Sequence, residues 1–296
     1  EMCIRDSYGI VQGVGFRPFV SREASDLGLC GTVANKGSYV EIHAQGSEKA
    51  VEELKKALES RPPERSVIME IISAHADEPP FDSFEIIESE KEKGDIFVSP
   101  DIAVCEKCKG ELFDKTNRRY LHPFINCTQC GPRLTIMDSM PYDRVRTTMA
   151  DFPMCKDCEE EYTDPATRRY DAQPVCCNKC GPEVYIIGSE KKGAEAITAT
   201  REAVMAGKII AVKGIGGFHL CCDAKNESAV KRLRELKNRP AKPLAVMLKD
   251  ISAARRECDF GEVQEKLLTG WQKPIVLLDK KTSGSLCESV APDNPT

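Results

Sequence analysis

The feature that most constrains this chain is a doubled pattern of cysteines between residues 105 and 180. Eight cysteines form four C-x-x-C pairs, with 18 residues between the pairs of each half and 24 between the halves. At a constant offset of 50, the run CEKCKGELFDKTNRRY is matched by CKDCEEEYTDPATRRY. The pattern predicts two copies of one module, in which two thiolate pairs are held apart by a polar insert that ends in Arg-Arg-Tyr.

Four soft thiolates suit a tetrahedral zinc ion in a closed site, which leaves no position for water or substrate. We therefore predict two structural Zn²⁺ ions. Their ligands are Cys105, Cys108, Cys127 and Cys130 in the first half, and Cys155, Cys158, Cys177 and Cys180 in the second. A disulfide framework is the alternative, but it explains neither the C-x-x-C spacing nor the other cysteines among the 15.

Two neighbouring side chains are not expected to be ligands. His122 lies five residues before Cys127, but the second half has Ala172 at the equivalent position, and repeated sites should use repeated ligands. Cys176 corresponds to Asn126 in the first half, and its choice would break the two-residue spacing of the pair.

The composition is that of a globular protein with room for two or three domains, since the 296 residues are 41% hydrophobic and carry mixed charges. No apolar run approaches the roughly 18 residues of a membrane span, and no secretory signal opens the chain. We therefore expect no membrane partner. So many cysteines without a secretory signal favour a reducing, cytoplasmic location, where thiols stay free to bind metal. The net charge of −5 gives no general attraction to nucleic acid.

A glycine-rich loop near the start of the chain has the features of an anion site. Two glycines in the segment Gln12-Gly13-Val14-Gly15-Phe16 allow a tight loop whose backbone N–H groups can converge on an anion. A helix is predicted to follow, with Pro18 in its first turn and Gly28 as its stop. A glycine loop that leads into a helix N-terminus favours phosphate, and Arg17 adds a planar fork for two phosphate oxygens.

The elements that follow predict a ferredoxin-like fold. Strands are expected at residues 30–35, 38–44, 67–75 and 82–88, with an amphipathic helix at 47–60 that Ser47 caps. The order βαββαβ with an extra edge strand is that of a ferredoxin-like sandwich. With the segment Gly9 to Arg17, this region resembles acylphosphatase. The first seven residues, EMCIRDS, lack the basic and apolar alternation of that family's first strand.

The acylphosphatase resemblance implies roles for two residues. In that family the loop amides and the arginine hold the acyl phosphate, while an asparagine on the next strand positions the attacking water. Arg17 and Asn35 are the matching positions here. Fixed donors and one cation suffice for this chemistry, because charge builds up on the phosphoryl oxygens and no nucleophilic side chain is needed.

After Pro182 the pattern changes to alternating helices and strands. The expected elements are a helix at 197–206, a buried strand at 208–213, a flexible turn at 214–219, a helix at 226–237 capped by Asn226 or Ser228, and strands at 244–248 and 275–279. The segment K-G-I-G-G-F-H-L followed by K-x-R-P-x-K-P-L resembles the YrdC-type nucleotide-binding fold. That resemblance implies that Lys237 and Arg239, with Lys242 nearby, bind the phosphates of ATP, which is used with Mg²⁺.

The order of these regions resembles the HypF family of carbamoyltransferases, and the segment INCTQCGPR at 125–133 supports that resemblance. We therefore expect an α+β multidomain chain. Its predicted parts are an acylphosphatase-like domain at 1–92, a tandem pair of four-cysteine zinc modules at 93–186, and a truncated YrdC-like domain at 187–296. We expect the chain to be the N-terminal part of a longer protein, because the Ser-x-Asn half of the YrdC phosphate grip is not found before Thr296.

The HypF resemblance implies an enzyme that acts on carbamoyl phosphate and ATP. In that family carbamoyl phosphate is hydrolysed to carbamate, which is joined to ATP as carbamoyl adenylate. The carbamoyl group then passes to a cysteine of the partner HypE, toward the cyanide ligands of iron in [NiFe] hydrogenases. An alternative class is an RNA-binding protein, with zinc ribbons and the basic segment 231–242 as its contact surface.

Overall fold

The computed structural model describes residues 2–37, 39–75, 79–87 and 101–292. Contacts divide the chain into two compact units, Glu1–Glu183 and Val184–Thr296. The first unit contains both the ferredoxin-like and the cysteine-rich regions. The charged run at residues 88–95 predicts a linker into the cysteine-rich region, but it lies outside the described residues. The domain boundaries remain a prediction.

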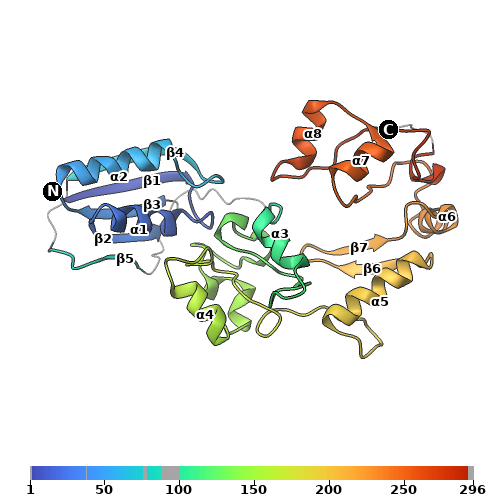
Figure 1. The fold of residues 1–296 in the computed structure, drawn as a ribbon, viewed down its shortest axis with the longest axis horizontal. Coiled ribbons are helices and arrows are strands. Elements are labelled where there is room, and N and C mark those ends of the chain that lie inside the picture. Colours follow the sequence, from blue (N-terminus) through green and yellow to red (C-terminus); the bar gives the residue numbers. More distant parts are fainter. Residues whose placement is uncertain (1, 38, 76–78, 88–100, 293–296) are drawn as a thin grey trace. The chain divides into compact units, whose positions relative to one another are not determined.

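The first unit begins with a five-stranded sheet and two helices, as predicted (Figure 1). The strands lie in the order β4-β1-β3-β2-β5, and only the β2–β5 pair is parallel. Their bounds are β1 (Met2–Ile10), β2 (Cys30–Lys36), β3 (Tyr39–Gln45), β4 (Val67–His75) and β5 (Phe84–Ile86), with α1 (Phe16–Asp26) and α2 (Glu48–Ser60). This confirms the ferredoxin-like fold with an additional edge strand.

Local signals account for these elements. The Ser47 hydroxyl accepts a hydrogen bond from the backbone N–H of Ala50 at 3.2 Å, which caps α2 as predicted. Alternate residues of β3 are buried, so that one face of this strand packs on the core. Both helices and strands β2 and β3 supply that core, which includes Val20, Val33, Ile42 and Leu54. The fold therefore rests on one apolar layer between the sheet and the helices.

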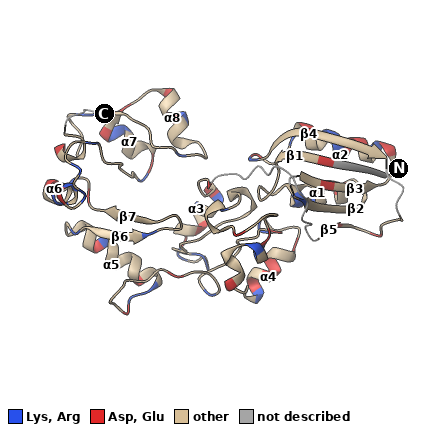
Figure 2. Ribbon diagram, turned by 180° about the vertical axis from the view of Figure 1, so that it is seen from behind, with Lys and Arg blue, Asp and Glu red and all other residues tan. Residues whose placement is uncertain are grey.

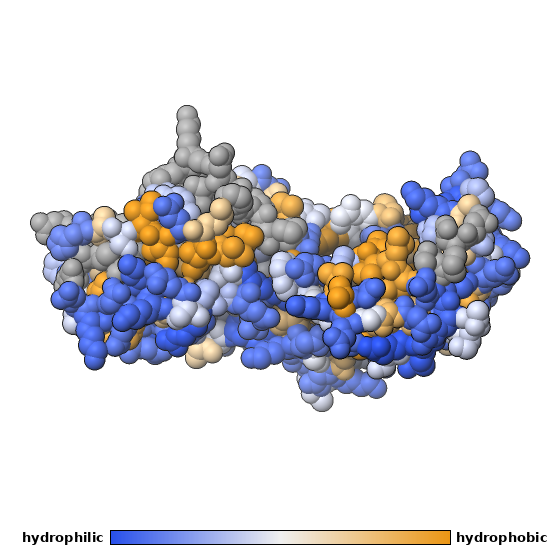
Figure 3. Space-filling view, turned by 90° about the horizontal axis from the view of Figure 1, so that it is seen from above, coloured by the Kyte–Doolittle hydropathy of each residue, from blue (hydrophilic) through white to orange (hydrophobic). Residues whose placement is uncertain are grey.

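Strand β1 occupies an interior position in the sheet although its sequence lacks the expected alternation. It pairs antiparallel with β3 on one side and with β4 on the other. The outer strand, β4, exposes Val67, Met69 and Ile72, each 46–66% accessible. Figure 3 shows hydrophobic surface gathered on this side of the first unit.

The two cysteine-rich halves follow the same path. Helix α3 (Glu106–Phe113) begins directly after Cys105, and α4 (Lys156–Thr163) begins directly after Cys155. In each half an equivalent hydrogen bond closes the insert: Leu121 N–H donates to Leu112 O, and Asp171 N–H donates to Tyr162 O, both at 2.9 Å. Helix α4 is mainly acidic: after Lys156 it carries Asp157, Glu159, Glu160 and Glu161 (Figure 2). The repeat seen in the sequence is thus a repeat in structure.

Short 3₁₀ turns complete the first unit. They are η1 (Thr128–Cys130), η2 (Leu134–Ile136), η3 (Arg144–Arg146) and η4 (Thr148–Asp151). The segment that carries η2 to η4 connects the two halves of the repeat and contributes Tyr142 and Met149 to the buried residues.

The second unit combines helices with short strand pairs. Its elements are α5 (Gly193–Met205), β6 (Ile210–Lys213), β7 (Phe218–Cys221), α6 (Glu227–Leu236), α7 (Ile251–Glu257), β8 (Cys258–Asp259), α8 (Glu262–Thr269), β9 (Asp279–Lys280) and η5 (Glu288–Val290). The predicted helices at 197–206 and 226–237 are present. Asn226 is the cap of α6, since its side chain accepts from the N–H of Ala229 at 3.0 Å.

Four predictions for the second unit are wrong. The strand predicted at 208–213 is not buried: residues 211–213 of β6 are exposed because β7 is its only partner among the described strands. Residues 218–219 belong to β7 rather than to a flexible turn. No strand forms at 244–248, where Leu244 N–H bonds only locally to Val290 O, and β9 covers just one residue of the strand expected at 275–279.

None of the helices in the described part of the chain combines the length and the apolar character that crossing a membrane requires.

Candidate active site and metal centres

The eight predicted ligand cysteines come together as two groups of four. The groups are Cys105, Cys108, Cys127 and Cys130, and Cys155, Cys158, Cys177 and Cys180, with the sulfur atoms of each group within 4.8 Å of one another. For Zn–S bonds of about 2.3 Å, a tetrahedron has edges of about 3.8 Å. The recorded S–S distances are 3.6–3.9 Å in the first group and 3.6–3.8 Å in the second. The donor sets therefore fit a closed structural zinc site in each half.

His122 and Cys176 lie beside these groups but outside them. The Nε2 atom of His122 is 3.1 Å from the Cys176 sulfur, and its Nδ1 atom is 2.9 Å from Asn178 Oδ1. Burial lowers the pKa of His122 to about 4, an effect that the hydrogen bond to Asn178 opposes. The two side chains therefore interact with each other in the core.

The Arg-Arg-Tyr segment of each half reaches across to the cysteine group of the other half. Arg168 Nη1 lies 3.2 Å from the sulfur of Cys108, and Arg119 Nη2 lies 3.5 Å from that of Cys158. Each pair of arginines also meets one glutamate of the opposite half. Arg168 and Arg169 contact Glu111, while Arg118 and Arg119 contact Glu161.

This exchange gives the two halves a pseudo-two-fold interface. Burial acts to raise the pKa of Glu161, but Arg119, Arg169 and Arg118 lower it below its ordinary value, so this carboxylate stays charged. Guanidinium groups that donate to thiolates reduce the negative charge that four thiolates place around one metal. Each half would therefore stabilise a metal bound by the other.

We expect Arg168→Ala to weaken zinc binding by the first cysteine group. Arg118→Ala should weaken zinc binding by the second group, because Arg118 Nη1 lies 3.8 Å from the sulfur of Cys155. Loss of a group that supports metal ligands typically costs 10–100-fold in metal affinity, so a decrease of about tenfold is expected. Competition with a chelator measures both affinities. Lys156→Ala is the matched control, because Lys156 forms an exposed pair with Glu160. If Arg168→Ala and Arg118→Ala each bound both zinc ions as tightly as Lys156→Ala does, the cross-contacts would have no role in metal binding.

The glycine loop has the geometry of an anion site. Gly13 and Gly15 have positive φ angles of 69° and 80°, so the loop turns through the left-handed region directly before α1. Both also lie against the zinc region: a Cβ on Gly13 would come within 2.7 Å of Pro132 and 2.9 Å of Tyr142. Glycine is therefore required here both for the turn and for the close approach of the zinc region.

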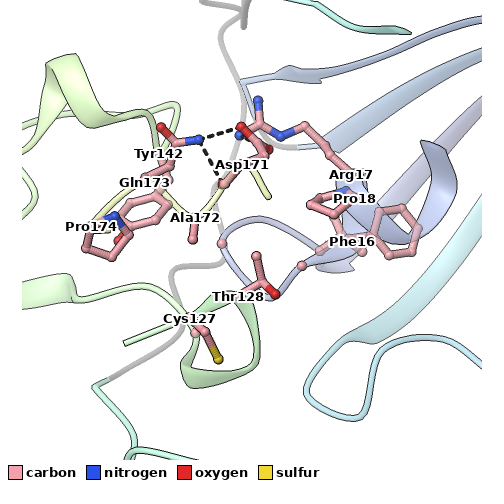
Figure 4. Close-up of a pocket in the computed structure, with 14 residues that line it drawn as sticks. Phe16, Arg17, Pro18, Cys127, Thr128, Tyr142, Asp171, Ala172, Gln173 and Pro174 are labelled. Atoms are coloured by element: carbon pink, nitrogen blue, oxygen red, sulfur yellow. Dashed lines mark hydrogen bonds and ion pairs between the residues drawn. The ribbon is translucent and has the colours of Figure 1, made fainter. Parts of the chain in front are cut away.

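Arg17 lies in the first turn of α1, where the positive end of the helix dipole favours anions, and it is 7% exposed. Its guanidinium group faces the carboxylate of Asp171 (Figure 4) and also that of Asp143, both in the zinc region. Nη1 is 3.4 Å from Asp143 Oδ1, and Nη2 is 3.1 Å from Asp171 Oδ2. Charge-assisted N–H to carboxylate bonds are usually about 2.7–2.9 Å long. Both contacts of Arg17 are longer than this.

A pocket lies between the loop and the zinc region. Its lining includes Gly13, Gly15 and Arg17 on one side and Thr128, Tyr142, Asp171 and Gln173 on the other. The predicted loop residues Val14 and Gln12 lie beside it, and both are buried. The Nε2 atom of Gln12 donates to Gly37 O at 3.0 Å, which ties the loop to the end of β2.

Asn35 is not among the residues that line this pocket. It lies near the end of β2, fully buried, and neither polar atom of its side chain has a hydrogen-bond partner among the described residues. A buried amide without partners is costly in a structural position. The position therefore has no packing explanation and suits a group that binds water or ligand.

The predicted nucleotide-binding residues lie at and after the end of α6. Lys237 and Lys242 are exposed, and Arg239 is half-buried with its Nη2 donating to Pro243 O at 2.9 Å. Sequence reasoning missed Arg234, which is buried and donates to the carbonyl groups of Arg239 and Lys242 at 2.8 and 3.1 Å. Arg234 shapes this loop, and its guanidinium group is not available as part of a basic RNA-binding surface.

Asp143 and Asp171 are the other residues that the sequence did not single out. They lie 126 and 154 positions from Arg17 in the chain, so no spacing pattern connects them with it. The sequence contained one signal: the first half of the repeat has Leu121 where the second half has Asp171.

Family comparisons agree with this architecture. The acylphosphatase family matches residues 7–86, the HypF finger matches 104–137 and 154–187, and the family described as telomere recombination (Sua5, YciO and YrdC) matches 202–296. An acylphosphatase of Synechococcus is 48% identical over 66 residues, which cover 22% of this chain and 73% of that protein. The first unit therefore contains a domain of the acylphosphatase family, joined to a tandem zinc finger of the HypF type.

The whole chain is homologous to HypF carbamoyltransferases. It is 49% identical to Carbamoyltransferase HypF2 of Cupriavidus necator over 93% of its length, and 46% identical to Carbamoyltransferase HypF of Synechocystis over 97%. A crystal structure of full-length HypF in a phosphate- and nucleotide-bound form matches 99% of this chain with a TM-score of 0.92 and 43% identity. The chain spans 35–39% of the length of these three proteins. The resemblance seen in the sequence is confirmed.

Proposed function

We propose that the first unit hydrolyses carbamoyl phosphate to carbamate and phosphate. The observation that carries this proposal is the glycine loop with two left-handed residues that leads into the N-terminus of α1 beside Arg17. The loop amides and Arg17 hold the phosphoryl oxygens, on which charge develops during the reaction. Asn35 positions the attacking water. No side chain is required as a nucleophile.

Asn35→Ala should lower kcat for phosphate release from carbamoyl phosphate by about 10²-fold with little change in KM, because orienting water matters at the chemical step. The loss of stability in this variant should not exceed the cost of a small cavity, since Asn35 makes no hydrogen bond to another described residue. Steady-state phosphate release and thermal unfolding measure the two effects. An unchanged kcat would refute the role of Asn35, and an inactive parent chain would refute the hydrolysis itself.

The two zinc ions have a structural role in this proposal. Their ligands would be the eight thiolates described above, so that sulfur would take all four positions around each metal. The metal would hold the wall of the pocket that faces the glycine loop, because Cys127 and Thr128 line that pocket.

In the whole protein, we propose that the second unit contributes to ATP use. Lys237, Arg239 and Lys242 would contact the phosphates of ATP with its Mg²⁺, and carbamate would be converted to carbamoyl adenylate. The carbamoyl group would then pass to a cysteine of a HypE-type partner, as in the maturation of [NiFe] hydrogenases. Relatives 42–49% identical that are named carbamoyltransferases, and a related structure described as nucleotide-bound, support this proposal.

A further inference from the structure

The wall of the pocket opposite Arg17 is built by the second half of the zinc repeat. Asp171, Ala172, Gln173 and Pro174 all line it, and Figure 4 shows Asp171 and Gln173 on the side that faces Arg17. A substrate whose phosphate bound the loop and Arg17 would therefore place its acyl group against this wall. In an acyl phosphate only one bridging oxygen separates the acyl carbon from phosphorus, so groups that touch Arg17 are within reach of the acyl substituent.

The repeat departs from its own pattern at this wall. At an offset of 50, the first half has Leu121, His122 and Pro123 where the second half has Asp171, Ala172 and Gln173. The backbone is nevertheless the same, since Leu121 and Asp171 have φ angles of 52° and 55°. An apolar residue is therefore sufficient for the fold at this position. The carboxylate of Asp171 serves something other than the shape of the module.

Neighbouring side chains fix the orientation of that carboxylate. Its Oδ1 atom accepts hydrogen bonds from Gln173 Nε2 at 2.7 Å and from the hydroxyl of Tyr162 at 3.3 Å. Oδ2 is thereby directed to Arg17 at 3.1 Å. The Asp171 side chain is 11% exposed, and burial raises its pKa although Arg17 acts to lower it. The result is one oriented acceptor atom at the point where an acyl group would lie.

The chemistry of an oriented acceptor separates two classes of acyl phosphate. A carbamoyl group presents N–H donors beside its carbonyl, whereas an acetyl group presents a methyl group. A buried carboxylate oxygen gains a charge-assisted hydrogen bond from an N–H but loses hydration without compensation against a methyl group. Sites built to hydrogen-bond a substrate N–H or O–H strongly reject analogues that lack it.

We propose that Asp171 is a specificity-determining residue of the acyl-phosphate site, which accepts a hydrogen bond from the carbamoyl N–H group and so selects carbamoyl phosphate over acyl phosphates without an N–H group. The inference rests on the proposed hydrolysis at Arg17. It gives the zinc repeat a direct part in substrate choice. Asp143 differs from Asp171, because Arg146 Nη1 binds its Oδ2 atom at 2.6 Å and leaves its other oxygen toward Arg17.

The test compares phosphate release from carbamoyl phosphate and from acetyl phosphate by the full chain. Asp171→Leu places the residue of the first half at this position and should lower the ratio of the two kcat/KM values by about 10–100-fold. Asp171→Asn should lower it too: Gln173 and Tyr162 hold the amide oxygen, so the NH₂ group faces the substrate. In the control Asp143→Asn, the ratio should stay within about twofold of that of the parent chain.

The possible results distinguish a failure of the proposed selectivity from a failure of the proposed hydrolysis. Suppose that both Asp171 variants retain zinc and that each changes the KM for carbamoyl phosphate and the KM for acetyl phosphate equally. Asp171 then only forms an ion pair with Arg17 when no substrate is bound, and the proposed selectivity is wrong. An unchanged ratio of the two kcat/KM values in Asp171→Asn alone would also show that the proposed selectivity is wrong, since that variant preserves shape and polarity. If the parent chain releases phosphate from neither substrate, the proposed hydrolysis fails and the inference with it.

Discussion

Arg17→Ala is expected to abolish measurable acyl-phosphate hydrolysis, with kcat/KM lowered by at least about 10²–10³-fold. Arg17 is the cation at the N-terminus of α1, beside the glycine loop. It holds the phosphate both in the ground state and in the transition state, so substrate affinity and turnover should fall together. Initial rates of phosphate release over a range of carbamoyl phosphate concentrations separate the two effects.

Two further variants make this result specific. Arg17→Lys keeps the charge but lacks the planar fork, and it should retain partial binding with poor turnover. Arg61→Ala removes an arginine whose ion pair with Glu23 lies on the surface, and it should behave like the parent chain. Thermal unfolding must accompany the rates, because loss of Arg17 leaves the Asp171 carboxylate without its cation. Normal turnover by folded Arg17→Ala would show that the anion site lies elsewhere.

Local and repeated patterns were sufficient to predict most of the first unit. The alternation in β3, the cap at Ser47 and the glycine before α1 are each encoded within a few residues. The cysteine groups were predictable because a C-x-x-C pair fixes two ligands on one turn, and a second pair at a repeated distance completes the set. In these regions the short-range signal and the final structure agree.

Contacts between distant segments were not predictable from such patterns. The Arg-Arg-Tyr segments were interpreted as polar inserts, yet Arg119 is 2% exposed and reaches the opposite half. The contact of Arg17 with Asp143 and Asp171 joins two regions that the sequence treats as separate domains. The strand predicted at 244–248 failed for the same reason, because a strand exists only where a partner strand pairs with it.

The cross-contacts change what loss of one zinc ion should do. With independent modules, removal of a ligand would loosen only its own half. Here Arg118 and Arg119 contact Glu161 in the opposite half, while Arg168 and Arg169 contact Glu111. If one half unfolds, its arginines no longer support the other metal site. Loss of either zinc should therefore weaken the other site and displace the Asp171 wall of the pocket.

Cys177→Ala is expected to lose the second zinc ion, to weaken the first, and to lower the Tm by about 10 °C or more. A structural zinc contributes about 10–16 kcal/mol in small zinc peptides, and loss of only about 4 kcal/mol would shift the Tm this far in a unit of this size. Cys176→Ala is the matched control: both cysteines are buried, but only Cys177 belongs to a group of four sulfur atoms. Metal analysis, unfolding and phosphate release on both variants test the argument. Loss of zinc in Cys176→Ala but not in Cys177→Ala would reverse the ligand assignment, and a first site of unchanged affinity in Cys177→Ala would mean that the two halves bind metal independently.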